Sequence, residues 1–302
     1  MITYNHDRYI KEAINGILSQ KTNYNYELII SNDCSPDDTD SVIKEIIRVH
    51  PEGKRIRYFN QKKNLGITPN FLFTLKEAKG KYIALCEGDD YWTDENKLQA
   101  QVDFLENNPT YSGSATQSII IKEGKGATFE NNLFSDNGKT TLTFKDFLGA
   151  RPFHTASLVF RNNLPLQRFP NNILSADRFL YLLISSFGSI NYSSSSTCVY
   201  RKNDTGISRR VTSKDLKKDL KMVKILYSLN NNIDKDLLYK FIHKTIINYS
   251  NKLFFKDFIR SYFMICFYNL KRGKTNKQEL VSLVRNFASY LDSYRKGEKI
   301  YV

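Results

Sequence analysis

An apolar run from Tyr82 to Cys86 leads directly into a dense acidic turn, Glu87-Gly88-Asp89-Asp90, and then into Tyr91-Trp92. The apolar run predicts a buried strand, so the turn lies where that strand ends. Carboxylates this close together repel one another, and they are stable where a divalent cation or the hydroxyl groups of a ligand absorb the charge. The run therefore predicts a ligand site at a strand end, beside aromatic rings that suit the face of a sugar.

Strands and helices alternate along the first half of the chain. The pattern predicts strands over residues 26–31, 56–59 and 81–86, and helices over residues 8–20, 41–49 and 71–78. This order favours an α/β fold with a mainly parallel central sheet and helices on both faces. Ligands of such sheets bind at the carboxyl ends of the strands, and Asp33 and Asp89-Asp90 both follow predicted strands.

Residues 110–210 are mixed in pattern. They predict strands over 118–121, 156–160 and 198–201 and a helix over 177–187.

Positive charge is concentrated in the last 89 residues. The net charge is +14, and from residue 214 onward there are 19 Lys and Arg against 8 Asp and Glu. The pattern there predicts three or four basic amphipathic helices, which we interpret as a helical extension over 211–302. Such helices suit an anionic membrane surface, and a solvated helix face in a Lys-rich protein is the alternative.

The cysteines indicate reduced thiols. They lie far apart, without a CxxC pair, which argues against a disulfide framework and against a zinc site. No secretory signal and no apolar run of about 18 residues is visible. We therefore expect a cytoplasmic protein, whose membrane contact would be peripheral, on the inner face of the plasma membrane.

Six short motifs follow one another along residues 1–210. They are Thr3-Tyr4-Asn5, Ser31-Asn32-Asp33-Cys34-Ser35 with Asp38-Thr39, Asn64-Leu65-Gly66, Glu87-Gly88-Asp89-Asp90, Ala176-Asp177, and Val199-Tyr200-Arg201 with Gly206-Ile207-Ser208. Each motif alone is weak, but the set in this order resembles the family 2 glycosyltransferases, which have the GT-A nucleotide-sugar fold. The resemblance implies a GT-A domain over 1–210, with a nucleotide-binding half at 1–109 and an acceptor half at 110–210.

The resemblance implies a catalytic and a metal-binding role for four carboxylates. Asp177 corresponds to the general base, and Asp90 to a ligand of a divalent cation, Mn²⁺ or Mg²⁺. Glu87 supports the metal, and Asp89 contacts the ribose or the metal. The alternatives are a solvated acidic turn and, for Asp177, a carboxylate that favours the helix dipole.

The donor site implied by the resemblance begins at the first two motifs. Asp33 corresponds to the residue that accepts the uracil N3–H, Thr3 and Tyr4 frame the base, and Asn5 and Asn64 complete the donor side. An Asx turn or a helix cap is the alternative for Asp33.

Three further residues are expected near the substrates. Arg201 pairs with the diphosphate or else forms a surface salt bridge, and Trp92 stacks on a sugar ring or belongs to the core. His154 lines the donor sugar or the acceptor, although a lone His is more often structural.

The sequence departs from the family pattern in three places. Only Met1 and Ile2 precede the first motif, where the family has a full apolar strand, so we expect a shortened chain or a misassigned start. Glu87 replaces the first Asp of the acidic motif. Lys202-Asn203 stands where many members have a His, and Lys202 supplies charge there instead.

The resemblance as a whole implies an inverting, metal-dependent transfer of a sugar from a UDP-linked donor. The acceptor would be a saccharide or lipid-linked glycan in bacterial surface polysaccharide assembly. A catalytically impaired protein that binds nucleotide sugar or glycan is the alternative. Nucleic acid is not an expected partner, because the sequence has no zinc spacing, RNP-like aromatic pattern or Walker loop.

Overall fold

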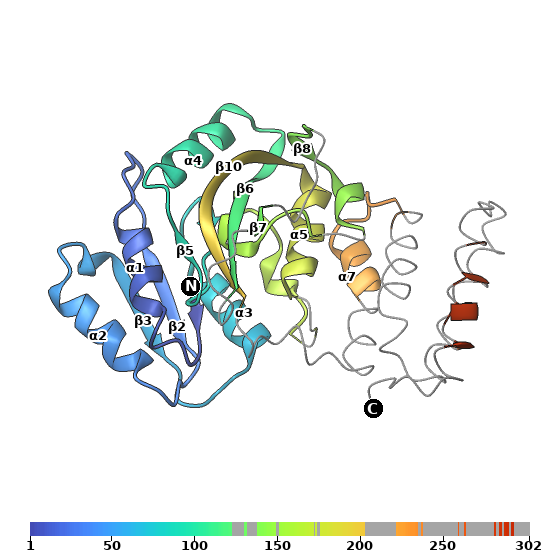
Figure 1. Ribbon diagram of the computed structural model, residues 1–302. Coiled ribbons are helices and arrows are strands. Elements are labelled where there is room, and N and C mark those ends of the chain that lie inside the picture. The colour runs from blue at the N-terminus through green and yellow to red at the C-terminus, as the bar shows by residue number, and fades with distance from the viewer. Residues whose placement is uncertain are drawn as a thin grey trace. The chain divides into compact units, whose positions relative to one another are not determined.

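The computed structural model describes residues 1–122, 130–131, 138–148, 151–171, 173, 176–202 and 222–234, with a few isolated positions beyond (Figure 1). It divides into two compact units. The first comprises 1–144, 151–171 and 176–204, and the second comprises 145–150, 172–175 and 205–302. The predicted boundaries at 109 and 210 remain predictions.

The first unit begins with a parallel three-stranded sheet in the order β1-β2-β3. Its strands are β1 (Ile2–Thr3), β2 (Leu28–Asn32) and β3 (Ile56–Asn60). Between them lie the helices α1 (Ile10–Leu18) and α2 (Thr39–Val49), the short 3₁₀ helix η1 (Gly53–Arg55) and, after β3, α3 (Ile67–Glu77). The predicted alternation of strand and helix is confirmed over these residues. Helices α1 and α2 each bury one apolar stripe, as amphipathic helices do.

The second sheet has seven strands and mixed direction. Its path is β4-β9-β6-β10-β5, with β7 paired to β6 and β8 paired to β10. The bounds are β4 (Tyr82–Ala84), β5 (Tyr91–Trp92), β6 (Tyr111–Lys122), β7 (Glu130–Asn131), β8 (Thr141–Leu142), β9 (Val159–Arg161) and β10 (Ser189–Lys202). The long pair β6–β10 is parallel, and the other pairs are antiparallel. The α/β fold is thus confirmed, while its parallel part is confined to the first sheet and this one pair.

Helices α4 (Lys97–Asn107) and α5 (Ala176–Phe187) pack on the second sheet, and α1 also contacts its strand β5. Short 3₁₀ segments η2 (Phe144–Phe147), η3 (Thr155–Ser157) and η4 (Leu166–Arg168) connect the strands. Helix α5 is buried along most of its length, because its sequence is apolar nearly all round.

The second unit contains α7 (Met222–Leu229). Most of the predicted basic helices lie outside the described residues. Among the residues that the structure does describe, no helix is both long and apolar enough to cross a membrane.

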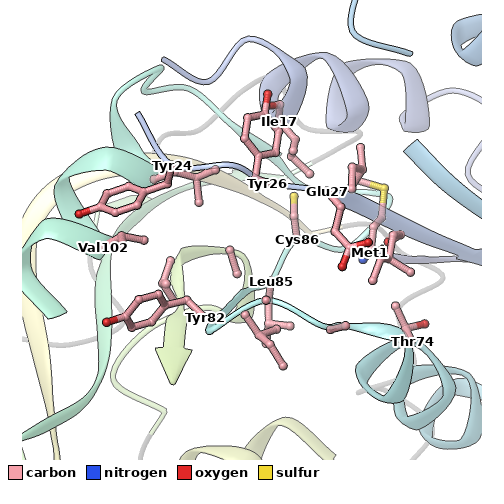
Figure 2. Close-up of a pocket in the computed structure, with 18 of the residues that line it drawn as sticks. Met1, Ile17, Tyr24, Tyr26, Glu27, Thr74, Tyr82, Leu85, Cys86 and Val102 are labelled. Atoms are coloured by element: carbon pink, nitrogen blue, oxygen red, sulfur yellow. Dashed lines mark hydrogen bonds between the residues drawn. The ribbon is translucent and has the colours of Figure 1, made fainter. Parts of the chain in front are cut away.

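A cavity of about 630 Å³ lies between β2 and β4 in the first unit (Figure 2). Tyr24 and Tyr26 line it from one chain segment, Tyr82 lines it from β4, and Val102 of α4 lines it as well. Met1 and Ile29 both line the cavity, and the Met1 amine donates a hydrogen bond to the carbonyl oxygen of Ile29 at 2.7 Å. Met1, Leu28 and Ile29 line the cavity near the amino-terminal ends of β1 and β2, and the cavity reaches the acidic turn at Glu87.

A buried ammonium group ties α4 to η3. Lys97 is 1% exposed, and its Nζ donates to Oε1 of Gln101 at 2.5 Å and to the carbonyl oxygen of Ser157 at 3.2 Å. The same Nζ lies 4.6 Å from the ring centroid of Trp92, whose Nε1 donates to the Ala156 carbonyl oxygen at 2.8 Å. These bonds fix the turn that immediately follows His154.

We predict that replacing Lys97 with Met changes how stability responds to alkali. Burial lowers the pKa of Lys97 from 10.5 to about 8, so between pH 8 and 10.5 the unfolded chain binds more protons at this site than the folded chain does. The free energy of unfolding should therefore rise with pH in the wild type, relative to Lys97→Met, by up to about 1.4 kcal/mol per pH unit. Urea unfolding at pH 8 and pH 10 measures this. Parallel curves for the two proteins would contradict it.

Candidate active site

The ends of β1 and β2 meet the acidic turn. The carbonyl oxygen of Thr3 accepts a hydrogen bond from the Asp33 amide at 2.9 Å, and that of Ile2 accepts one from the Gly88 amide at 3.0 Å. A Cβ at Gly88 would lie 2.5 Å from Thr3 Oγ1, so only glycine lets the turn approach this closely. Thr3, Asp33 and the acidic turn therefore lie together at one edge of the sheet. The sequence predicts this for Asp33 and the turn, because both follow strands at their carboxyl ends.

Asp33 holds the loop of the third motif. The residue is 3% exposed, its Oδ1 accepts from the Leu65 amide at 2.7 Å, and its Oδ2 accepts from the Gly66 amide at 2.9 Å. Asn64 is exposed, and its Oδ1 also accepts from the Gly66 amide, at 3.0 Å. The predicted donor residues Asp33 and Asn64 are therefore joined through one glycine amide.

The residues after Thr3 form an exposed corner. Tyr4 is 45% exposed, so its ring is open to a ligand. Asn5 has a φ of +61°, and its amide donates to Ser35 Oγ at 3.0 Å. Asn tolerates this left-handed conformation better than most residues do, and the corner is held against the loop that follows β2.

The three carboxylates of the acidic turn have different environments. Asp90 is 3% exposed, and its Oδ1 accepts from the Arg201 amide at 2.9 Å. Asp89 is half-buried, with Oδ2 3.8 Å from His6 Nε2. Among the described residues, Oε2 of Glu87 is buried without a hydrogen-bond partner. Burial, followed by the charge of Asp89, raises the pKa of Glu87 to about 7 and that of Asp90 well above its ordinary value.

These carboxylates fit a divalent cation in part. Carboxylate oxygens are the ligands that Mg²⁺ and Mn²⁺ prefer, and among the described residues Oε2 of Glu87 is buried without a hydrogen-bond partner. Within the part of the chain that the structure describes, however, no three carboxylate, imidazole or thiol groups stand ready to hold an ion by themselves. An ion here would need oxygen ligands from a substrate as well.

Asp177 lies in the first turn of α5 and forms an ion pair. One carboxylate oxygen of Asp177 lies 2.9 Å from Nη1 of Arg151, and the Asp177 side chain is 26% exposed. One turn further on, the Tyr181 hydroxyl is 2.9 Å from Thr155 Oγ1. The charge of Asp177 contributes to the raised pKa of Glu87, which brings α5 into the electrostatic reach of the acidic turn.

His154 lies flat against Tyr200. Their ring centroids are 4.0 Å apart at an interplanar angle of 13°. Burial, with the charges of Lys202 and Arg151, lowers the pKa of His154 to about 3, while burial and Asp90 raise the pKa of Tyr200 to about 12. Both rings are therefore uncharged at neutral pH, and His154 can exchange hydrogen bonds with a hydroxyl group.

Two expected contacts look different in the structure. Trp92 is 5% exposed and its ring faces Lys97, so it belongs to the core and the expected stacking on a sugar is wrong. The Arg201 side chain is 10% exposed and pairs with Glu12, and its Nη1 donates to the Asp89 carbonyl oxygen at 2.8 Å. Its contact with a diphosphate stays a prediction.

Sequence reasoning missed several neighbours of the site. They are His6 beside Asp89, Glu12 beside Arg201, Arg151 beside Asp177, and Tyr200 beside His154. His6 and Tyr200 stand next to or within motifs that were singled out, so their positions were a usable signal. Glu12 pairs with Arg201 and Arg151 pairs with Asp177, and both pairs join distant parts of the chain. No local sequence pattern predicts them.

Comparison with known proteins identifies related sequences. The model of glycosyl transferase family 2 matches residues 1–163. An uncharacterized protein of Mycobacterium tuberculosis is 34% identical over 207 residues, which cover 68% of this chain and 58% of that protein. The minor teichoic acid biosynthesis protein GgaB of Bacillus subtilis is 24% identical over 305 residues, which cover 97% of this chain and 32% of GgaB. The chain thus spans only part of the length of these relatives.

Two solved structures share the fold. TarS 1-349 of S. aureus in complex with UDP-GlcNAc has a TM-score of 0.69 at 14% identity, covering 98% of this chain and 90% of that one. The mannosyltransferase PcManGT of Pyrobaculum calidifontis in complex with GDP-Man and Mn²⁺ has a TM-score of 0.58 at 15% identity, covering 99% and 81%. At these identities the likeness concerns the fold alone.

We predict that Glu87→Gln stabilises the metal-free protein. The folded pKa of Glu87 is raised from 4.5 to about 7, so its contribution to stability is lost as pH rises from 4.5 to 7 and stays lost above. Glutamine carries no charge, so Glu87→Gln should unfold at a higher temperature than the wild type at pH 8, with a gain of up to about 3 kcal/mol. At pH 4 the gain should vanish.

Differential scanning calorimetry in EDTA measures this pH dependence. Glu45→Gln, which alters an exposed glutamate paired with Arg48, is the matched control and should show no such trend. An equal change at pH 4 and pH 8 would contradict the buried-charge explanation.

Proposed function

The chain belongs to glycosyl transferase family 2, and from this premise we propose that it transfers a sugar from a UDP-linked donor to an acceptor hydroxyl, with inversion at the anomeric carbon. The observation that carries the proposal is the meeting of Thr3, Asp33 and the acidic turn at one sheet edge through main-chain hydrogen bonds. Main-chain hydrogen bonds thereby fix the proposed donor-binding residues next to the carboxylates of the acidic turn.

The nucleotide lies, in this proposal, against Asp33 and Tyr4. The Asp33 carboxylate already orders the 64–66 loop, and each of its oxygens can accept a further hydrogen bond. A uracil N3–H supplies such a donor, which favours uracil over a base that lacks it. The UDP-GlcNAc bound by TarS, which has the same fold, supports a uridine nucleotide.

A divalent cation belongs, in this proposal, between Asp90, Asp89 and the diphosphate. Bound there, the ion would neutralise the charge that develops on the leaving diphosphate. Asp90 and Asp89 would hold it, with Glu87 behind them, and phosphate oxygens would complete its coordination, as is common for Mg²⁺. The Mn²⁺ bound by PcManGT supports the use of a cation in this fold.

Asp177 acts as the general base in this proposal. Its carboxylate takes the proton from the acceptor hydroxyl as that oxygen bonds to the anomeric carbon, and the bond from this carbon to the diphosphate oxygen breaks on the opposite face. The guanidinium of Arg151, 2.9 Å from this carboxylate, holds it in place at the start of α5. Neutral His154, stacked on Tyr200, is placed to orient a sugar hydroxyl.

The acceptor is, in this proposal, a saccharide or lipid-linked glycan of a surface polysaccharide. The similarity to the teichoic acid protein GgaB supports this class of acceptor. Lipid-linked acceptors are found at membranes, and the excess of positive charge after residue 214 would favour peripheral contact with anionic lipid on the cytoplasmic side.

We predict that Asp177→Asn separates binding from chemistry. The amide cannot accept the proton, so transfer, or hydrolysis of UDP-sugar when water is the acceptor, should fall by about 10²- to 10⁴-fold, while UDP affinity changes little. Release of UDP from a panel of UDP-sugars, with Mn²⁺ present, measures the rate.

Glu45→Gln is the matched control, because Glu45 is an exposed carboxylate of α2 outside the six motifs. Equal rates for Asp177→Asn and the wild type would overturn the role of the base. Binding of UDP without any turnover by the wild type would favour a catalytically impaired binding protein instead.

A further inference from the structure

Arg201 stands where β10 passes the acidic turn. Strand β5 pairs with β10 directly beside it, with Tyr91 opposite Val199. The Arg201 amide donates to Asp90 Oδ1 at 2.9 Å, and the Arg201 guanidinium donates through Nη1 to the Asp89 carbonyl oxygen at 2.8 Å. Arg201 therefore bonds to both aspartates of the turn. Its main-chain amide bonds to the Asp90 carboxylate, and its side chain bonds to the Asp89 carbonyl oxygen.

The guanidinium is itself held on several sides. Its Nη2 pairs with the carboxylate of Glu12 on α1. Its carbon Cζ lies 4.4 Å from the ring centroid of Tyr91 and 5.2 Å from that of Tyr9. With 10% of the side chain exposed, little of this group remains available to a ligand. Stacking between two rings suits a planar guanidinium and would suit an ammonium group less well.

We propose that Arg201 is a positioning residue that fixes the directions of the Asp89 and Asp90 carboxylates, and that Glu12 in turn fixes Arg201. The inference rests on the proposed function, in which these carboxylates hold a cation with the diphosphate. The bond to the Asp89 carbonyl oxygen fixes the peptide unit that joins the two aspartates, so the side chain of Arg201 acts on both. Direct contact between Arg201 and the diphosphate is the alternative that the experiment distinguishes from this positioning role.

Repulsion between the carboxylates of the turn explains why the turn needs a positioning residue. Glu87, Asp89 and Asp90 lie within four positions of one turn, where Glu87 Oε2 is buried without a hydrogen-bond partner and Asp90 is 3% exposed. Without a fixed peptide between them, the like charges would drive the aspartates apart and into solvent before a cation arrives. A turn held by protein groups keeps its carboxylates at the spacing that a cation and its phosphate ligands use.

The test compares Arg201→Lys and Glu12→Gln in the full chain. The first readout is amide hydrogen exchange of the Asp89–Trp92 segment in EDTA. Both variants should exchange several-fold faster than the wild type. Arg201→Lys should show the larger change, because lysine retains the charge but loses the planar stacking and has one nitrogen in place of the two that bond to Asp89 and Glu12. Glu12 is half-exposed and on a different element, so Glu12→Gln guards against a general loss of folding.

The second readout is the affinity for Mn²⁺ in the presence of UDP. A positioning role should weaken Mn²⁺ binding by about 10- to 100-fold in Arg201→Lys, and less in Glu12→Gln, while UDP affinity at saturating Mn²⁺ stays within about twofold. Glu45→Gln, which breaks an exposed ion pair on α2, is the matched control.

Two results would overturn the inference. One is unchanged exchange of the Asp89–Trp92 segment in both variants. The other is a loss of UDP affinity in Arg201→Lys at every Mn²⁺ concentration with no effect of Glu12→Gln, which is the signature of direct contact with the diphosphate. If the wild type itself fails to bind UDP with Mn²⁺, the proposed function fails, and the exchange experiment still decides whether Arg201 orders the turn.

Discussion

The mutual repulsion of Glu87, Asp89 and Asp90 is the constraint on which the surrounding hydrogen bonds depend. Carboxylates placed within four positions and largely removed from water are costly in the ionised state, as the raised pKa of Glu87 to about 7 indicates. A chain keeps such a turn where the charge is used. The main-chain bond between Gly88 and Ile2 holds the turn on one side, and Arg201 holds it on the other.

The same bonds connect this turn with the rest of the site. β1 joins the turn to Asp33, and Asp33 orders the loop at Leu65 and Gly66. On the other side, Lys97 and the buried Trp92 fix η3, which positions His154 beside Tyr200. The nucleotide side and the acceptor side of the proposed site are therefore each attached to the core through main-chain carbonyl and amide groups, which explains how the fold keeps them in register.

Local patterns in the sequence predicted the helices, and they predicted which carboxylates follow strand ends. The rule that ligands gather at strand ends placed Asp33 and the acidic turn together, and helix periodicity located α1 and α5 within two residues. The direction of the second sheet was not predictable in this way, because the β6–β10 pair joins strands that are far apart in the sequence. Trp92 illustrates a further limit, since spacing alone does not tell a ring in the core from one that faces a ligand. The partner of Arg201 lies 189 residues away, on α1.

The most direct test of the account is calorimetric titration of UDP into the protein, with and without Mn²⁺, repeated with Asp90→Ala. We expect micromolar binding that depends on Mn²⁺ and is lost in the variant, because Asp90 and the diphosphate would share the ion. UDP binding that ignores both Mn²⁺ and Asp90→Ala, or no binding under either condition, would contradict the claim that the acidic turn is the cation and diphosphate site of a glycosyltransferase.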